Sequence, residues 1–138
     1  MNNLGIFIDT GGFVATRNED DENYDTAKKM MKSILLNDYG AIYTSDYVFD
    51  EAVTIAYIRT QDKKFPIDLG NYILKSKKIR FIFTTTEDFN AGWDFFLKYK
   101  DKKLSFTDCT ILSIMNRLNI EYIFSYDSHF DGLKKRLY

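Results

Sequence analysis

Two aspartates directly follow apolar segments that have the composition of buried strands. Asp9 comes after Ile6-Phe7-Ile8, and Asp127 comes after residues 122–126. Open parallel sheets bind ligands at the carboxyl ends of their strands, so two such strands lying near each other would bring these carboxylates together. An aspartate at this place is also a common turn former or helix cap, and each residue taken singly is open to that interpretation.

A third acid, Glu51, falls in a helical segment where a simple core pattern would have an apolar side chain. At 100° per residue it lies between Val48, Ile55 and Ile58, which predicts that it points toward the core side. The adjacent Asp50 lies at the edge of that stripe, and we expect it to be solvated or to act as a cap.

A fourth acid, Asp108, is predicted near the start of a helix, on the face that carries Ile111, Leu112 and Met115. Residues 105–108, Ser-Phe-Thr-Asp, are close to a capping box, in which Asp108 would accept a backbone hydrogen bond. Capping and catalysis are compatible, because the N-terminus of a helix favours an ionised carboxylate.

Four carboxylates converging on one cleft would repel one another, and some would become protonated unless a cation lay between them. A hard divalent cation, Mg²⁺ or Mn²⁺, takes oxygen ligands and leaves positions open for phosphate oxygens. Such a site suits phosphodiester hydrolysis. The motifs of a phosphate-binding loop, a dinucleotide fold, a serine hydrolase and a His-Glu-x-x-His zinc enzyme do not occur in the sequence.

Strand-like and helix-like segments alternate along the chain, which predicts an α/β fold with a mostly parallel central sheet and helices on both faces. The first strand is expected to end in a turn at Asp9-Thr10-Gly11-Gly12, and Ser45 or Asp46 to cap the helix that follows the second strand. The expected strands are 4–8, 41–44, 80–84 and 122–126, and the expected helices are 22–37, 46–59, 64–76, 86–99 and 105–119.

The length of 138 residues predicts one domain over residues 1–138, and 45% hydrophobic residues suffice for a core. The single cysteine, Cys109, excludes an intrachain disulfide, and the single histidine, His129, excludes a histidine-rich zinc site. The first ten residues have no basic segment and only a short apolar run. We therefore expect a soluble, cytoplasmic protein with no membrane segment.

Charge is distributed unevenly around a net value of −1. Residues 1–62 hold five Lys or Arg and eleven Asp or Glu, a balance of −6, whereas residues 63–138 hold fourteen and nine, a balance of +5. A basic face could follow a phosphate backbone, although solvated helix ends explain the same pattern. The strongly acidic stretch Glu19–Asp25 suggests solvation, favourable charge at a helix N-terminus or a basic partner.

The sequence resembles the PIN-domain family, in particular the VapC-type toxin ribonucleases. The resemblance spans the chain and rests on Ile6-Phe7-Ile8-Asp9-Thr10, the helical Glu51, and the segments 105–109 (Ser-Phe-Thr-Asp-Cys) and 125–130 (Ser-Tyr-Asp-Ser-His-Phe). It implies a PIN-like three-layer sandwich and a Mg²⁺- or Mn²⁺-dependent endoribonuclease. The implied catalytic and metal-binding residues are Asp9, Glu51, Asp108 and Asp127.

By the same resemblance, Thr10 and Thr107 would be hydrogen-bonding groups behind the metal ligands, with Ser125 a weaker candidate. The family also implies an RNA substrate, a cognate antitoxin that covers the site, and a homodimer.

Asp131 is an alternative to Asp127, although Asp127 is nearer the strand end. His129 could touch a phosphate, but a hydrogen bond within its own loop is the simpler expectation.

Other functional classes of protein have a similar α/β fold. A PIN nuclease of RNA processing or decay would have the same acids, but usually in a longer chain, and a non-catalytic module binding RNA or protein would have lost them. A receiver domain would need an adjacent acidic pair after the first strand, and a haloacid-dehalogenase phosphatase would need Asp-x-Asp there. The aromatic residues around Trp93 could stack on bases, although packing in a core or at a dimer face is the better expectation.

Overall fold

The computed structural model describes residues 5–138, and within them a five-stranded sheet in which all the pairings are parallel. The strand order is β3-β2-β1-β4-β5. The strands are β1 (Gly5–Ile8), β2 (Ala41–Ser45), β3 (Ile79–Ile82), β4 (Tyr122–Phe124) and β5 (Lys135–Leu137). Leu4, which we expected to begin the first strand, lies outside the described residues.

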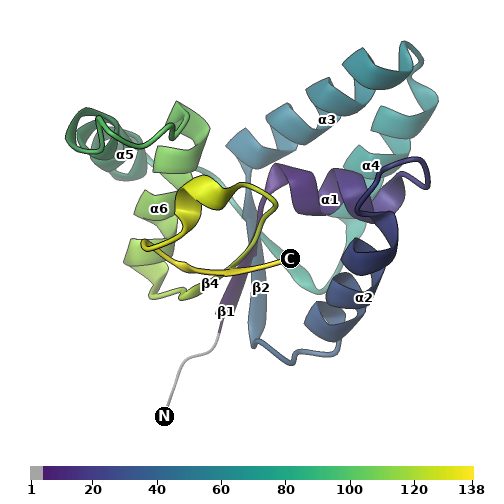
Figure 1. The fold of residues 1–138 in the computed structure, drawn as a ribbon, viewed down its shortest axis with the longest axis horizontal. Coiled ribbons are helices and arrows are strands. Elements are labelled where there is room, and N and C mark those ends of the chain that lie inside the picture. The colour runs from purple at the N-terminus through teal and green to yellow at the C-terminus, as the bar shows by residue number, and fades with distance from the viewer. Residues whose placement is uncertain (1–4) are drawn as a thin grey trace.

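Helices cover both faces of the sheet, which confirms the predicted α/β class and its three layers (Figure 1). In that view α5 and α6 lie on one side of the sheet, and α1 to α4 lie on the other. The helices are α1 (Thr10–Arg17), α2 (Tyr24–Leu35), α3 (Asp46–Thr60), α4 (Lys64–Lys75), α5 (Thr86–Lys98), α6 (Phe106–Leu118) and the 3₁₀ turn η1 (Ser128–Phe130).

The central strand β1 is buried along its whole length, because helices cover it on both faces and strands flank it on both edges. This environment explains why its sequence is a continuous apolar run rather than an alternating one. Ile6 is in register with Ile42 of β2 and with Tyr122 of β4. The ends of β1 and β4 therefore lie side by side, which meets the condition for Asp9 and Asp127 to converge.

Helix α1 is absent from the sequence-based prediction, which placed a turn at Gly11-Gly12. The structure instead starts a helix directly after Asp9, whose carboxylate accepts a hydrogen bond from the backbone N–H of Thr10. Gly12 is a packing residue in this helix, because an added Cβ would lie 2.9 Å from the ring of the buried Phe124. A glycine pair read locally indicates a turn, whereas this one allows a helix to approach a strand closely.

The C-terminal strand β5 was also missed, and the predicted strand 122–126 ends earlier, at Phe124. Residues 134–136 are all basic, so composition alone indicated a charged surface segment. Lys135 and Arg136 form a short edge strand with Leu137, because their backbone pairs with β4 in register from Tyr122–Lys135 to Phe124–Leu137. Within the part of the chain that the structure describes, no helix has both the length and the apolar character to cross a membrane.

We predict that Gly12→Ala lowers the free energy of unfolding by about 1–3 kcal/mol, because the methyl group would overpack against the Phe124 ring. Gly11→Ala is the matched control. There the added Cβ would lie 3.7 Å from Tyr126, an ordinary contact, and the change should stay within about 1 kcal/mol. Urea unfolding of the two variants measures both values, and equal effects would contradict the packing role assigned to Gly12.

Candidate active site

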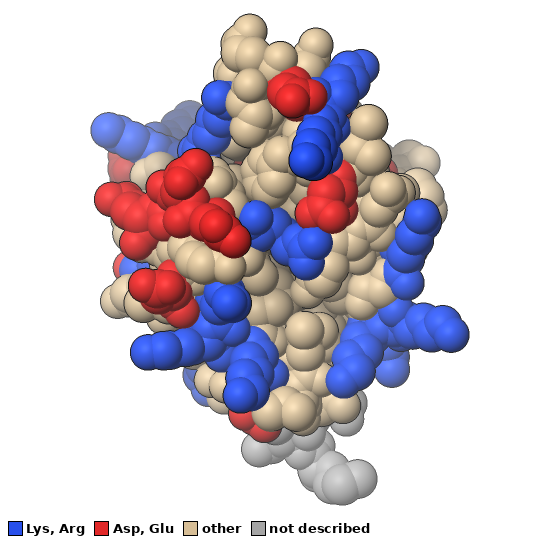
Figure 2. Space-filling model, turned by 90° about the vertical axis from the view of Figure 1, so that its right-hand side faces the viewer, with Lys and Arg blue, Asp and Glu red and all other residues tan. Residues whose placement is uncertain are grey.

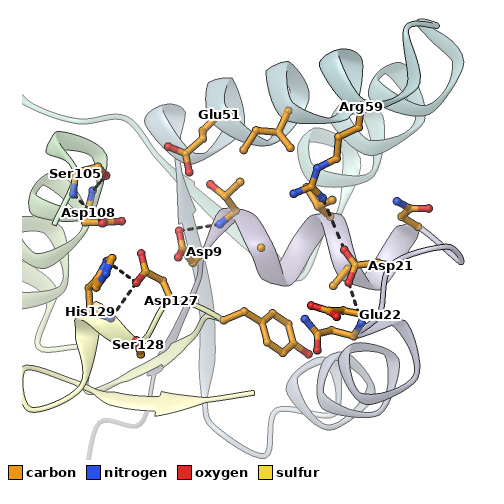
Figure 3. Close-up of a pocket in the computed structure, with 18 of the residues that line it drawn as sticks. Asp9, Asp21, Glu22, Glu51, Arg59, Ser105, Asp108, Asp127, Ser128 and His129 are labelled. Carbon is orange, nitrogen blue, oxygen red and sulfur yellow. Dashed lines mark hydrogen bonds and ion pairs between the residues drawn. The ribbon is translucent and has the colours of Figure 1, made fainter. Parts of the chain in front are cut away.

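The four predicted acids line one cleft of about 840 Å³ at the carboxyl ends of β1 and β4 (Figure 3). Asp9 follows β1 and Asp127 follows β4, while Glu51 projects from α3 and Asp108 from the first turn of α6. The labelled carboxylates point into the same space from these four elements. Asp9 and Asp127 are 118 positions apart, and their convergence is what the strand-end argument predicts for neighbouring strands.

Asp9 is the most deeply buried acid of the cleft, with 5% of the residue exposed. Its Oδ1 accepts a hydrogen bond of 2.8 Å from the N–H of Thr10, and its Oδ2 accepts one of 2.7 Å from the Ser125 hydroxyl. Asp9 also caps α1 while lining the cleft, so the cap and the cleft position that the sequence left as alternatives occur together in one residue.

Ser125 links two of the acids, although the family resemblance made it only a weak candidate. Its hydroxyl donates to Asp9 and accepts a hydrogen bond of 3.0 Å from the N–H of Asp127. The side chain is fully buried directly after β4. One hydroxyl therefore fixes the spacing between the loop after β4 and the carboxylate after β1.

The capping box expected at the start of α6 is present. The Ser105 hydroxyl accepts from the N–H of Asp108, and the Asp108 carboxylate accepts from the N–H of Ser105, at 3.0 and 2.9 Å. These bonds hold the Asp108 side chain at the cleft, which Ser105 also lines. Sequence reasoning treated Ser105 only as a cap, and nothing in its local pattern marks its second role.

A second capping box, Thr85 and Asp88 on α5, has the same local geometry but different electrostatics. Asp88 is buried, and two hydrogen bonds of 2.9 and 2.8 Å from Arg117 join it to α6. Burial raises the pKa of Asp88, but the hydrogen bonds from Arg117 and Thr85 outweigh it and hold the pKa below its ordinary value. Asp88 is thus a structural acid, whereas Asp108 faces other carboxylates.

Glu51 lies at the cleft for a different reason from the one predicted. The buried face of α3 is formed by Val48, Ala52 and Ala56, and Ile58 is 62% exposed, so the expected core stripe through Ile58 is wrong. Glu51 is half-buried and lines the cleft. Asp50 is exposed, as expected for a solvated acid, and it lies outside the cleft lining.

The two threonines expected behind the metal ligands differ in position. Thr10 lines the cleft and is buried, but its Oγ1 has no hydrogen-bond partner among residues 5–138, and its contact with Asp9 is through the backbone N–H. Thr107 lies outside the cleft lining, and its carbonyl accepts a hydrogen bond from the Thr110 hydroxyl. The structure places Ser105 and Ser125, rather than Thr107, beside the acids.

Crowding of the acids changes their protonation. Burial, followed by the negative charge of Asp108, raises the pKa of Asp9 from 3.8 to about 7, and Glu51 adds to this rise. Burial also raises the pKa of Asp108 to about 6, with further increases from Asp127 and Glu51. The hydrogen bonds from Ser125, Thr10 and Ser105 oppose these shifts without cancelling them. The arrangement therefore favours a bound cation.

The donor atoms of the cleft fit a divalent metal ion. Oxygen atoms of Asp108 and Asp127 and a ring nitrogen of His129 lie within 4.8 Å of one another. Asp9 and Glu51 line the same cleft and supply further carboxylate oxygens. Asp131, the sequence alternative to Asp127, instead forms an ion pair of 2.7 Å with Arg136, which lowers its pKa, and it lies outside the cleft lining.

The far end of the cleft is formed by the loop between α1 and α2. Asp20, Asp21 and Glu22 line it, and Asp21 lies 3.8 Å from the guanidinium of Arg59 (Figure 3). The face carrying this loop has acidic side chains gathered to one side, among lysines and arginines (Figure 2). This finding gives the acidic stretch a location that the sequence analysis lacked.

Few of the basic residues reach the cleft. Among the described residues, the lysine and arginine side chains that line it are Lys103 and Arg59. Lys103 belongs to the basic second part of the sequence, but Arg59 comes from the acidic first part. Sequence reasoning missed Arg59, because only the tertiary packing of α3 beside α1 brings it to the cleft.

Comparisons with known proteins identify the family and the fold of the chain. Residues 6–136 match the family described as PIN domain. The chain is 24% identical over 127 residues to the 23S rRNA-specific endonuclease VapC20 of Mycobacterium tuberculosis, covering 92% of each chain. The crystal structure of VapC20, described as a sarcin-ricin loop cleaving toxin, superposes with a TM-score of 0.83 at 23% identity, covering 92% of this chain and 93% of the other. VapBC2 of Rickettsia felis, bound to a promoter DNA fragment, has a TM-score of 0.68 at 14% identity, with coverage of 97% and 98%.

We predict that Asp9→Asn raises the free energy of unfolding at pH 8 without metal by about 2–4 kcal/mol. The reason is that a carboxyl whose pKa is raised to about 7 on folding destabilises the folded state once it is ionised. That cost is absent below pH 4, grows as the pH rises toward 7 and is constant above it. Urea unfolding in EDTA at pH 4 and pH 8 measures the difference.

The control for this prediction is Asp50→Asn, which removes an exposed acid and should change stability by less than about 0.5 kcal/mol at both pH values. Adding Mn²⁺ at pH 8 should stabilise the wild-type protein more than Asp9→Asn, because a ligand that binds the folded state stabilises it. An Asp9→Asn protein that is destabilised equally at both pH values would contradict the assigned repulsion.

We predict that Ser125→Ala raises the pKa of Asp9 above its wild-type value, because the variant loses the hydroxyl that donates to the ionised carboxylate. Stability should fall by about 1–3 kcal/mol, since the N–H of Asp127 loses its acceptor. Carboxyl ¹³C NMR titration of the metal-free protein measures the pKa. Ser113→Ala, at a buried serine of α6, is the control and should leave the Asp9 titration unchanged.

Proposed function

Because this chain belongs to the PIN-domain family, we propose that it is a metal-dependent endoribonuclease that hydrolyses RNA phosphodiester bonds. We further propose that it is the toxin of a toxin–antitoxin pair and that residues 1–138 form a single PIN-like nuclease domain. The observation that carries the proposal is the convergence of four carboxylates on one cleft, with raised pKa values for Asp9 and Asp108.

Asp9 and Asp108 are the first candidates for metal ligands, and Asp127 would complete the set. Glu51 would be a further ligand or a base for the attacking water. A bound Mg²⁺ or Mn²⁺ would supply positive charge that stabilises the phosphoryl group and would make a water molecule a stronger nucleophile. The four acids are the proposed catalytic residues.

The chain itself contributes preorganisation. Ser125 holds Asp9 and the backbone of Asp127, and Ser105 holds Asp108, so the acids are fixed before substrate arrives. Preset polar groups do not have to reorganise during the reaction, which lowers its barrier. Lys103 and Arg59 also line the cleft, and we propose that they contact backbone phosphates of the RNA.

The substrate class follows from the relative of known activity. VapC20 is described as specific for 23S rRNA and as cleaving the sarcin-ricin loop. We propose that this chain also cuts a structured RNA loop, and a ribosomal RNA hairpin is the first substrate to test. A PIN nuclease of RNA processing or decay would present the same acids and would differ in the RNA that it cuts.

Structural neighbours of this chain include toxin–antitoxin complexes, among them VapBC2 and a complex from Klebsiella pneumoniae. We propose a cognate antitoxin for this chain and a cytoplasmic location, where RNA and antitoxin are available. A non-catalytic module of the same fold is a weaker alternative, since all four acids are present and converge.

We also propose a homodimer, with the exposed apolar face of α5 as the contact. Phe89, Trp93, Phe96 and Leu97 are 42–50% exposed on this helix, and the Trp93 and Phe96 rings stack at 5.5 Å. A contiguous apolar surface of this kind is typical of an interaction site.

We predict cleavage of a structured RNA panel, including a 23S rRNA loop hairpin, in Mg²⁺ or Mn²⁺ and no cleavage in EDTA. Asp108→Asn should lower the rate by about 10²-fold or more, because the variant loses a proposed metal ligand. Gel analysis of end-labelled RNA measures the rates.

Two neighbouring acids on α3 provide a matched pair for the same assay. Glu51→Gln should slow cleavage by about 10²-fold, whereas Asp50→Asn should stay within about twofold of wild type. Metal-independent cleavage, or full activity in Asp108→Asn, would show that the nuclease assignment is wrong. Binding of RNA with no cleavage by folded, inhibitor-free protein in any metal would favour the non-catalytic module.

We predict that Trp93→Glu converts the homodimer into a monomer, because the charge would be buried in an apolar contact. Light scattering after size-exclusion chromatography measures the mass. Leu36→Glu, at a 65% exposed residue at the end of α2, is the control and should remain dimeric. A monomeric wild-type protein, or a dimeric Trp93→Glu, would refute the proposed interface.

A further inference from the structure

The side chain of His129 has an unusual position beside the acids. It follows Asp127 by two residues in the turn η1, and its Nδ1 lies 2.7 Å from Oδ1 of Asp127. This nitrogen is buried, yet it has no hydrogen-bond partner of acceptable geometry within residues 5–138. The contact is therefore close in distance but poorly aligned for an N–H donor.

When the imidazole nitrogen carries no proton, this close approach brings two electron-rich atoms together. An imidazole nitrogen that does not donate a hydrogen presents a lone pair, and a carboxylate oxygen accepts only. The Asp127 Oδ1 already accepts a hydrogen bond of 2.9 Å from the backbone N–H of His129. Such an arrangement is favourable when a cation accepts both lone pairs.

The spacing of the neighbouring donors fits that explanation. Oxygen atoms of Asp108 and Asp127 and a ring nitrogen of His129 lie within 4.8 Å of one another. Adjacent ligands in an octahedral site with bonds of about 2.1 Å are about 3 Å apart, close to the contact seen here. Figure 3 shows the imidazole and the Asp127 carboxylate turned toward each other, beside Asp108.

We propose that His129 supplies a nitrogen ligand to the divalent cation, which makes this a mixed nitrogen and oxygen site that prefers Mn²⁺ to Mg²⁺. The inference rests on the proposed metal-dependent function and adds a ligand and a metal preference to it. Imidazole binds first-row transition metals well, whereas Mg²⁺ favours oxygen ligands, so a nitrogen donor shifts affinity toward Mn²⁺.

The local structure supports a fixed ligand pair. Asp127 and His129 share one 3₁₀ turn, and the Asp127 carboxylate caps it. The N–H of Asp127 is held by Ser125, which also holds Asp9. The turn that carries both side chains is thus anchored at its start to a buried hydroxyl, before a cation binds.

Pulsed EPR of the Mn²⁺-loaded wild-type protein tests the nitrogen ligand directly. The chain has one histidine, so with any purification tag removed, ¹⁴N modulation from a coordinated imidazole can come only from His129. We expect this modulation in the wild-type protein. It should be replaced by the ¹⁵N pattern when histidine labelled with ¹⁵N in the ring is incorporated, a control that leaves the fold untouched.

Calorimetric titration of the same protein tests the preference. We expect tighter binding of Mn²⁺ than of Mg²⁺, and His129→Gln should lower Mn²⁺ affinity by about tenfold or more, since even groups behind a metal ligand contribute 10–100-fold. The Mg²⁺ affinity should change by less than about threefold. Asp50→Asn, at an exposed acid outside the cleft, should bind both metals like the wild type.

The outcomes separate this inference from the proposed function. Mn²⁺ binding that is lost in Asp108→Asn, but without imidazole modulation in the wild type, would overturn the His129 ligand and leave the nuclease site standing. A hydrogen bond or ion pair between His129 and Asp127 would then explain their contact. Failure of the wild-type protein to bind Mn²⁺ at all would overturn both. Imidazole modulation together with a selective loss of Mn²⁺ affinity in His129→Gln would support the inference.

Discussion

Repulsion between carboxylates in a partly buried cleft is the constraint around which the site is built. The fold brings Asp9 and Asp108 close to two further acids and removes them from solvent, so both pKa values rise. Such a cluster persists because the parallel sheet and its covering helices are stabilised elsewhere, by a continuous apolar core. A cation bound in the cleft would offset this loss of stability, since binding to the folded state adds to its stability.

The two capping boxes separate a local motif from its function. Asp88 and Asp108 occupy the same position in the same motif, and each accepts a hydrogen bond from the N–H of its N-cap residue. Asp88 is joined to Arg117, and that pair fastens α5 to α6. Asp108 meets Asp127 instead. Partners distant in sequence therefore decide that one acid is structural and that the other is suited to bind a cation, because charge–charge interactions depend on distance in space.

The cleft presents two electrostatic problems to a polyanionic substrate. At one end the carboxylates would repel a phosphate until a cation neutralises them. At the other end the loop between α1 and α2 places Asp21 beside Arg59, which limits the positive charge available to RNA there. Lys103 lies on the same cleft. Lys103 and Arg59 are therefore the positive side chains that the described part of the cleft offers to a phosphate backbone.

The sequence by itself determined the α/β class and most of the elements to within a few residues, because strand ends, helix periodicity and caps are local properties. It also marked the four acids that the fold brings to one cleft, although the core stripe that selected Glu51 is wrong. Tertiary structure decided the rest. Gly12 lies in a helix rather than a turn, and it packs against Phe124, 112 positions away, where a side chain would not fit. The edge strand β5 exists only through pairing with β4. Ser125 and His129 acquire their places from residues brought near by the fold, and no local pattern encodes which distant partner a side chain will meet.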